Sequence, residues 1–125
     1  MQTIAQVSRE ERLRIAIERD GATCVWCSRP FGELLTPTTE HLVPRVKGGP
    51  SWLENELAAC RRCNRERGHR SVAEWVQECR GRGWHPDVAR VRRALAALER
   101  VVAERGGQRR ARPYIDHQRR RLARL

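Results

Sequence analysis

Two pairs of cysteines have the spacing of metal-binding knuckles, Cys24-x2-Cys27 and Cys60-x2-Cys63. Four thiolates from two such pairs suit tetrahedral Zn²⁺, which needs four soft donors and imposes no further geometry. A redox role is disfavoured, because a second pair exists and no thioredoxin-like βαβ pattern surrounds either pair. The sequence therefore predicts one structural zinc site, which would supply much of the folding free energy of a small domain.

The fifth cysteine, Cys79, belongs to a different pattern. It completes an apolar stripe with Val72, Trp75 and Val76 at helical spacing. A thiol on such a stripe packs in the core more often than it binds a metal. We therefore expect four ligands and one spare cysteine.

An acid and a histidine, Glu40-His41, lie between the two cysteine pairs, and Asn64 directly follows Cys63. Hydrolysis of a phosphodiester needs a base for water and neutralisation of the charge that develops on phosphorus. His41 is the candidate base, since an imidazole titrates near neutral pH. Neighbouring strand residues face opposite sides, so Glu40 would reach the same site only through a twist or distortion at the strand end. Taken alone, the pair also fits an ordinary polar strand end.

These motifs occur in the order found in the HNH endonuclease family, which the stretch from roughly residue 10 to residue 70 resembles. The matching positions are Cys24-x2-Cys27, Glu40-His41-Leu42-Val43-Pro44, Gly48-Gly49, Asn55, and Cys60-x2-Cys63-Asn64 with Arg67-Gly68. The resemblance implies an α+β fold: a small ββα-metal core with a four-cysteine zinc site, an N-terminal helix and C-terminal helices. It also implies metal-dependent hydrolysis of DNA to a 5′-phosphate and a 3′-hydroxyl.

The resemblance further implies a role for each site residue. Glu40 and Asn64 would hold the catalytic ion, and their hard oxygen donors favour Mg²⁺ or Mn²⁺. Asn64 stands where many members have a last histidine, and Glu40 where aspartate is commoner. Asn55 would tie the loop across the hairpin and orient His41. His69 is the alternative ligand, although it lies past Gly68 on a different face of the helix.

The net charge of +11 favours a polyanionic partner, most often nucleic acid. A G+C-rich coding sequence accounts for the preference for Arg over Lys, but not for the excess of positive charge. The candidate phosphate contacts near the proposed site are Arg45, Lys47, Arg61, Arg65 and Arg67. Each of them could instead be merely solvated.

Turn and capping signals place the elements around these residues. A capping box at Ser8 starts a helix that ends at Gly21, and a second box at Ser71 starts one that ends at Gly81. Strands are expected within 34–43, broken at Pro37, and over 55–59; helices are expected over 60–67 and 86–104. The last helix carries an apolar stripe from Val88 to Val102, which would pack on this domain's own core or on a partner.

The chain reads as one HNH endonuclease domain, residues 1–105, with its core at 22–70 and a helical extension at 71–105. A basic tail, 106–125, would be a solvated or disordered arm or a phosphate-binding one. No run of apolar residues could span a membrane, and MQTIAQVSREE lacks the apolar core of a secretory signal, so a cytoplasmic location is expected. The partner would be DNA, with a homodimer or a larger nuclease complex, such as a phage packaging or restriction complex, as possible assemblies. A zinc-stabilised binding module without cleavage activity is the alternative.

Overall fold

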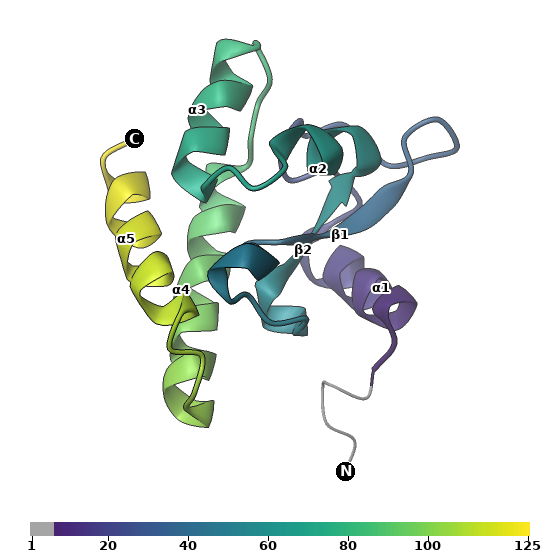
Figure 1. Ribbon diagram of the computed structural model, residues 1–125. Helices are drawn as coiled ribbons and strands as arrows, with labels where there is room; N and C mark the ends of the chain where they lie inside the picture. The colour runs from purple at the N-terminus through teal and green to yellow at the C-terminus, as the bar shows by residue number, and fades with distance from the viewer. Residues whose placement is uncertain (1–6) are drawn as a thin grey trace.

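A two-stranded antiparallel sheet lies between helices in the computed structural model, which describes residues 7–125 (Figure 1). Residues 1–6, at the start of the segment that lacks the features of a secretory signal, lie outside the described residues. Strand β1 (Pro37–His41) pairs with β2 (Glu56–Cys60), with Thr39 opposite Ala58 and His41 opposite Glu56. The α+β fold expected from the sequence is confirmed.

Helices make up most of the remaining structure of the described residues. In chain order the elements are α1 (Arg9–Asp20), β1, two short 3₁₀ turns η2 (Arg45–Lys47) and η3 (Leu53–Asn55), β2, α2 (Arg61–Arg67), α3 (Val72–Gly81), α4 (Val88–Arg105) and α5 (Ala111–Ala123). Helices α1 and α2 both pack on the sheet, whereas α3, α4 and α5 gather beside it (Figure 1).

Strand β2 forms although Glu and Ala are poor strand residues. All five of its residues are buried, because β1 pairs with it and α1 and α2 pack against the sheet. Strand β1 begins at Pro37, the residue at which the sequence predicted a break, which is where proline is tolerated because it lacks a ladder donor.

The predicted helix starts are present in the structure. The hydroxyl of Ser8 accepts a hydrogen bond from the amide of Glu11, and Ser71 does the same for Glu74. Helix α2 uses Cys60 as its N-cap, whose sulfur accepts from the amide of Cys63. The helix that carries the second cysteine pair is thereby started by one of the cysteines.

The apolar stripe of α4 packs within this domain: Val91, Leu95, Leu98 and Val102 are buried. Leu98 and Val102 form a cluster with Val43, Ala111 and Ile115, and therefore connect the loop after β1 to the C-terminal helices. Of the two expectations for this stripe, packing on the domain's own core is what the structure shows.

The basic segment at the C-terminus is a helix, contrary to the solvated or disordered arm that its charge suggested. One face of α5 buries Ala111, Ile115, Gln118 and Leu122, at helical spacing, against α3 and α4. Its polar groups also contribute, since Gln118 accepts from the amide of Ala73 and so satisfies a free donor in the first turn of α3. The arginines occupy the opposite face.

No helix within residues 7–125 has the length and apolar character needed to cross a bilayer.

Candidate functional site

The four predicted zinc ligands lie together. The sulfur atoms of Cys24, Cys27, Cys60 and Cys63 are all within 4.8 Å of one another, and all four residues are buried. Such a set of thiols fits a tetrahedral Zn²⁺, which holds four sulfurs at about 2.3 Å. Cys79 lies outside this group. The described residues contain no other cluster of metal-binding side chains of this kind.

Backbone amides surround the sulfur of Cys24 in the manner of a metal knuckle. The amides of Trp26 and Cys60 donate to it at 3.4 Å and 3.2 Å. Together with a hydrogen bond from the Cys63 thiol, which is the largest cause, they lower the pKa of Cys24 to about 5 and favour its thiolate form. A thiolate is the form that binds zinc. Burial raises the pKa of Cys79 to about 12, so this thiol stays protonated.

A cleft of about 320 Å³ lies along β1, between α1 and α2. It brings together Glu40, His41 and Asn64, and it also contains His69. The remaining residues that line it are Arg9, Arg12, Thr39, Pro44, Arg45, Glu56 and Gly68. Three of the predicted site residues therefore share one solvent-accessible hollow, and Asn55 is not among the residues that line it.

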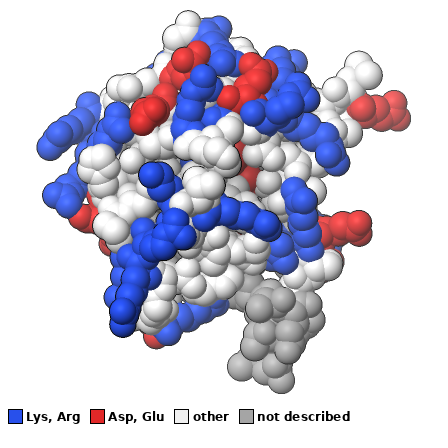
Figure 2. Space-filling model, in the orientation of Figure 1, with Lys and Arg blue, Asp and Glu red and all other residues white. Residues whose placement is uncertain are grey.

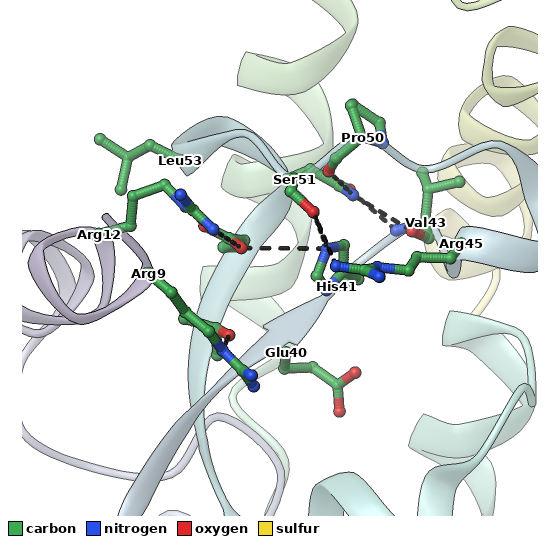
Figure 3. Close-up of polar contacts among 12 residues, drawn as sticks. Arg9, Arg12, Glu40, His41, Val43, Arg45, Pro50, Ser51 and Leu53 are labelled. Atoms are coloured by element: carbon green, nitrogen blue, oxygen red, sulfur yellow. Dashed lines mark hydrogen bonds and ion pairs between the residues drawn. The ribbon is translucent and has the colours of Figure 1, made fainter. Parts of the chain in front are cut away.

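The side chains of Glu40 and His41 lie on opposite faces of the sheet, and both line this cleft. They point apart in Figure 3, as expected for neighbours in a strand. His41 is the last residue of β1, and β1 pairs only with β2 among the described residues. Both side chains nevertheless line the same cleft, which at the strand end also contains Glu56, the partner of His41 in β2.

Glu40 is almost completely buried and is held by two donors. The indole N–H of Trp26 donates to Oε2 at 2.9 Å, and Nη1 of Arg67 donates to Oε1 at 3.0 Å. Burial raises the pKa of Glu40, while the charge of Arg67 and the two hydrogen bonds act in the opposite direction. These donors compensate the cost of burying a carboxylate.

Asn64 faces the carboxylate of Glu40 from α2. Its Nδ2 donates to Oε1 of Glu40 at 3.3 Å and to Oε2 at 3.2 Å. A carboxylate and a side-chain amide that lie this close could both give oxygen ligands to a cation if the amide turned over, since carboxylate and amide oxygens are hard donors.

His41 is held by its Nε2 atom, which lies 3.2 Å from the hydroxyl of Ser51 and 3.9 Å from Oε2 of Glu56 (Figure 3). No described residue forms a hydrogen bond with its Nδ1 atom. Burial, followed by the charges of Arg45 and Arg9, lowers the pKa of His41 to about 4. The imidazole is therefore neutral at pH 7 and able to accept a proton.

The loop after His41 is tied to β2 by Asn55, which is fully buried. Its Oδ1 accepts from the amide of Val43 at 2.9 Å, and its Nδ2 donates to the carbonyls of Val43 and Pro50 at 3.2 Å and 2.9 Å. Gly49 permits this closure, because a Cβ there would lie 1.7 Å from the carbonyl oxygen of Val43. The motif glycine and asparagine thus shape one loop.

Arg67, which the sequence predicted as a phosphate contact, is not accessible to a phosphate. It is buried, and its guanidinium donates hydrogen bonds to Glu40 and to the carbonyl oxygens of His41, Leu42 and Arg70. An arginine enclosed by these acceptors has no surface left for a phosphate. Its place at the end of α2, facing the buried side of β1, is the physical reason.

The other predicted basic residues, Arg45, Lys47, Arg61 and Arg65, are exposed. Lys and Arg side chains cover much of the face in Figure 2, with acidic side chains in smaller groups between them. Arg45 lines the cleft. Arg61 lines a smaller hollow of about 190 Å³ that shares Arg9 and Thr39 with the cleft.

Two arginines of α1 belong to the site although the sequence did not indicate them. Arg9 donates to the hydroxyls of Thr39 and Thr38 at 2.9 Å and 3.1 Å, and Arg12 forms an ion pair with buried Glu56 (Figure 3). Their spacing from His41 carries no motif. The only signal in the sequence was that both lie near the start of an amphipathic helix next to the cysteine pairs.

Comparison with known proteins identifies the same family as the motifs. Residues 24–79 match the HNH endonuclease family. A CRISPR-associated endonuclease Cas9 of Actinomyces naeslundii is 33% identical over 75 residues, which are 58% of this chain and 7% of that protein. A CRISPR-associated endonuclease Cas9 of Corynebacterium diphtheriae is 30% identical over 63 residues, 50% of this chain and 6% of that protein.

The chain thus matches only a small part of the length of these relatives. No solved structure matches the chain significantly.

Proposed function

We propose that this chain, which carries an HNH endonuclease domain at residues 24–79, hydrolyses phosphodiester bonds of DNA with the help of a bound divalent ion. The observation that supports this most strongly is the cleft that contains Glu40, His41 and Asn64 together. A base, a carboxylate and an amide oxygen in one solvent-accessible hollow are the groups that such hydrolysis needs.

Glu40 and Asn64 would hold the ion, since the side-chain amide of Asn64 lies within 3.3 Å of both carboxylate oxygens of Glu40 and can turn its oxygen toward an ion. Carboxylate and amide oxygens are ligands that Mg²⁺ and Mn²⁺ accept. When bound, the ion supplies neutralisation of the charge on phosphorus and on the departing 3′-oxygen. His69 lines the same cleft and is the alternative ligand.

His41 takes a proton from the attacking water. Its lowered pKa keeps it neutral at pH 7, and its contacts through Nε2 leave Nδ1 as the atom that accepts the proton. Asn55 acts indirectly, because it fixes the loop that starts two residues after His41 and that carries Ser51. Ser51 in turn limits the rotation of the imidazole.

The exposed cations around the cleft would bind the phosphates on either side of the scissile bond. Arg45 and Lys47 lie on the loop at one end, and Arg9 and Arg61 lie where the cleft meets the smaller hollow. No ion pair links any of these four side chains to a carboxylate among residues 7–125. They are therefore free to contribute the salt-dependent part of DNA affinity.

A nuclease that acts only within a larger assembly is the second candidate. It is favoured by one observation: the matched relatives are much longer proteins, in which the similar region is 6–7% of the length. Such relatives are named as CRISPR-associated endonucleases. If this chain works through a partner, that partner would add to the DNA-binding affinity of the small domain.

Conversion of supercoiled plasmid to nicked and linear forms tests the proposal. Wild type, His41→Ala and His117→Ala would be compared with Mg²⁺, with Mn²⁺ and without added ion, since His117 is an exposed histidine of α5 remote in the sequence from the motif. We expect ion-dependent cutting that falls by ~10² to 10⁴-fold in His41→Ala, the range for loss of a general base. His117→Ala should cut like wild type.

Cutting that survives in folded His41→Ala would contradict the assignment of the base. Binding without any cutting by the wild type would contradict the free-standing enzyme and leave the assembly as the remaining candidate. Preference for an RNA of the same sequence, measured in parallel, would change the substrate class.

A further inference from the structure

We infer that Trp26 is a positioning residue for Glu40 and that it links the predicted zinc site to the catalytic cleft. The inference rests on the proposed function, because Glu40 has a role only if the cleft holds a divalent ion. Trp26 lies between Cys24 and Cys27, so its backbone belongs to the first cysteine knuckle.

The knuckle fixes where the indole ring can lie. The amide of Val25 donates to the carbonyl of Ala58 in β2 at 3.1 Å, and the amide of Trp26 donates to the sulfur of Cys24. The Trp26 side chain is completely buried, and its N–H reaches Oε2 of Glu40 at 2.9 Å. A metal that holds the cysteines would therefore also hold this donor in place.

The second oxygen of Glu40 is fixed from α2. Arg67 donates to Oε1 at 3.0 Å, and its guanidinium lies 5.4 Å from the centre of the Trp26 ring. A carboxylate oxygen has two lone pairs, so each donor leaves one lone pair free. The side-chain amide of Asn64 lies within 3.3 Å of both oxygens, and both residues line the cleft. The two donors thus hold the carboxylate beside Asn64, where a cation shared by the two residues would bind.

The fold itself does not require the indole N–H to be paired. Trp75 is also completely buried, and its Nε1 atom has no hydrogen-bond partner among the described residues. The core of this domain tolerates one unpartnered indole, so burial alone does not explain the hydrogen bond of Trp26. The bond acts on the carboxylate, which without donors would be costly to bury.

The two tryptophans therefore provide a matched pair of substitutions. Trp26→Phe and Trp75→Phe each replace a buried indole by a phenyl ring, but only the first removes a hydrogen bond to Glu40. Three quantities would be measured on each full-length variant: bound zinc, Mn²⁺ affinity by electron paramagnetic resonance, and plasmid cutting as a function of Mg²⁺ concentration. Mn²⁺ affinity does not depend on turnover.

We expect Trp26→Phe to keep one zinc per chain and to bind Mn²⁺ about tenfold more weakly, because one hydrogen bond to a charged group is lost. It should need correspondingly more Mg²⁺ for half-maximal cutting. Trp75→Phe should keep the Mn²⁺ affinity of the wild type. Equal Mn²⁺ affinity in a zinc-loaded Trp26→Phe and in the wild type would overturn the inference.

If Trp26→Phe fails to fold, two variants of Arg67 provide a second test of the inference. Arg67→Lys retains a charged donor for Glu40, whereas Arg67→Met does not. Weaker Mn²⁺ binding by Arg67→Met, with recovery in Arg67→Lys, would support positioning of the carboxylate by its donors; equal Mn²⁺ affinity in both would overturn it.

The inference and the proposed function fail in different ways. A wild type that binds Mn²⁺ but cuts no nucleic acid would contradict the proposed function, while the effect of Trp26→Phe on Mn²⁺ affinity would still support or overturn the inference. A wild type that binds no Mn²⁺ would overturn both.

Discussion

The side-chain amide of Asn64 lies within 3.3 Å of both carboxylate oxygens of Glu40 and donates to them through Nδ2. A divalent ion held by both residues would require this amide to turn over, because only its oxygen can be a ligand. The contact is therefore the part of the cleft whose geometry should change when such an ion binds.

Replacement of Asn64 tests this contact. Asn64→Ala removes one oxygen donor and should weaken Mn²⁺ binding and cutting by on the order of 100-fold, the scale expected for groups that support a bound metal. Asn64→His restores a ligand of the type that many HNH family members have there, and it should recover cutting with Mn²⁺ better than with Mg²⁺, since imidazole is the softer donor. Plasmid cutting with each ion measures both effects. Full activity of Asn64→Ala would shift the ligand role to His69.

Because only one of the two buried residues Cys60 and Cys79 belongs to the cysteine cluster, we expect their substitutions to affect zinc content differently. Cys60→Ser removes one of four clustered sulfurs and should release the zinc and lower the unfolding temperature strongly, since structural zinc is coupled to folding. Cys79→Ser alters a buried thiol outside the cluster and should leave one zinc per chain. Zinc content by elemental analysis and thermal unfolding by circular dichroism check the two results. Loss of zinc from Cys79→Ser would contradict the assignment of the ligands.

The tight loop between β1 and β2 leads us to expect that alanine substitutions at two glycines, Gly49 and Gly32, change the stability of the fold by different amounts. A Cβ at Gly49 would lie 1.7 Å from a carbonyl oxygen, whereas a Cβ at Gly32 would meet nothing within 4 Å. Gly49→Ala must therefore displace backbone and should destabilise the fold by about 2 kcal/mol or more, while Gly32→Ala should change its stability little. Urea unfolding compares them. Equal stability would show that the loop can open without cost.

The depressed pKa of His41 predicts how stability depends on pH. In the unfolded chain His41 regains an ordinary pKa near 6.5, whereas in the folded chain the value is about 4. Between these values unfolding takes up a proton, so the stabilising contribution of neutral His41 is complete above pH 6.5 and is lost as the pH falls toward 4. The free energy of unfolding should decrease more steeply over this interval in wild type than in His41→Gln.

Urea titrations of both proteins at several pH values, without a chelator so that zinc is retained, measure this difference. Parallel curves for the two proteins would contradict the depressed pKa. They would also remove the reason for expecting a neutral base at pH 6.

The clustering of the four cysteines and the order of the HNH motif could be predicted because their spacing is local and specific. Cys60-x2-Cys63 lies at a helix start, and Glu40-His41 lies at a strand end; both placements follow from the neighbouring turn and capping signals. The caps at Ser8 and Ser71 are likewise determined by residues three positions away.

The partners of Glu40 could not be predicted in the same way. Trp26 and Arg67 are 14 and 27 residues from Glu40, and no local rule connects them. Arg67 was misjudged because arginine is ordinarily exposed, and its burial depends on acceptors that converge only in the folded protein. Arg9 and Arg12 were missed for a related reason, since their role depends on the way α1 packs along β1.

The C-terminal helix is a case in which the signal was present. Ala111, Ile115 and Leu122 repeat at helical spacing, but seven arginines dominate the composition of residues 106–125. The composition of a helix counts the residues on all of its faces, whereas the burial of the helix depends on the residues of one face. A periodicity count for the segment would have favoured a packed helix.

The start of α5 lies against the glycine turn of the loop between β1 and β2: a Cβ at Gly48 would be 2.8 Å from the Cβ of Arg110. Helix α1 supplies Arg9 and Arg12 from the opposite end of the chain. Residues 24–79, which define the family match, therefore exclude both helices that enclose the loop and the cleft. A version of this domain for transfer into another protein would therefore have to include its flanking helices, from about Val7 through α5, rather than end at the borders of the recognisable motif.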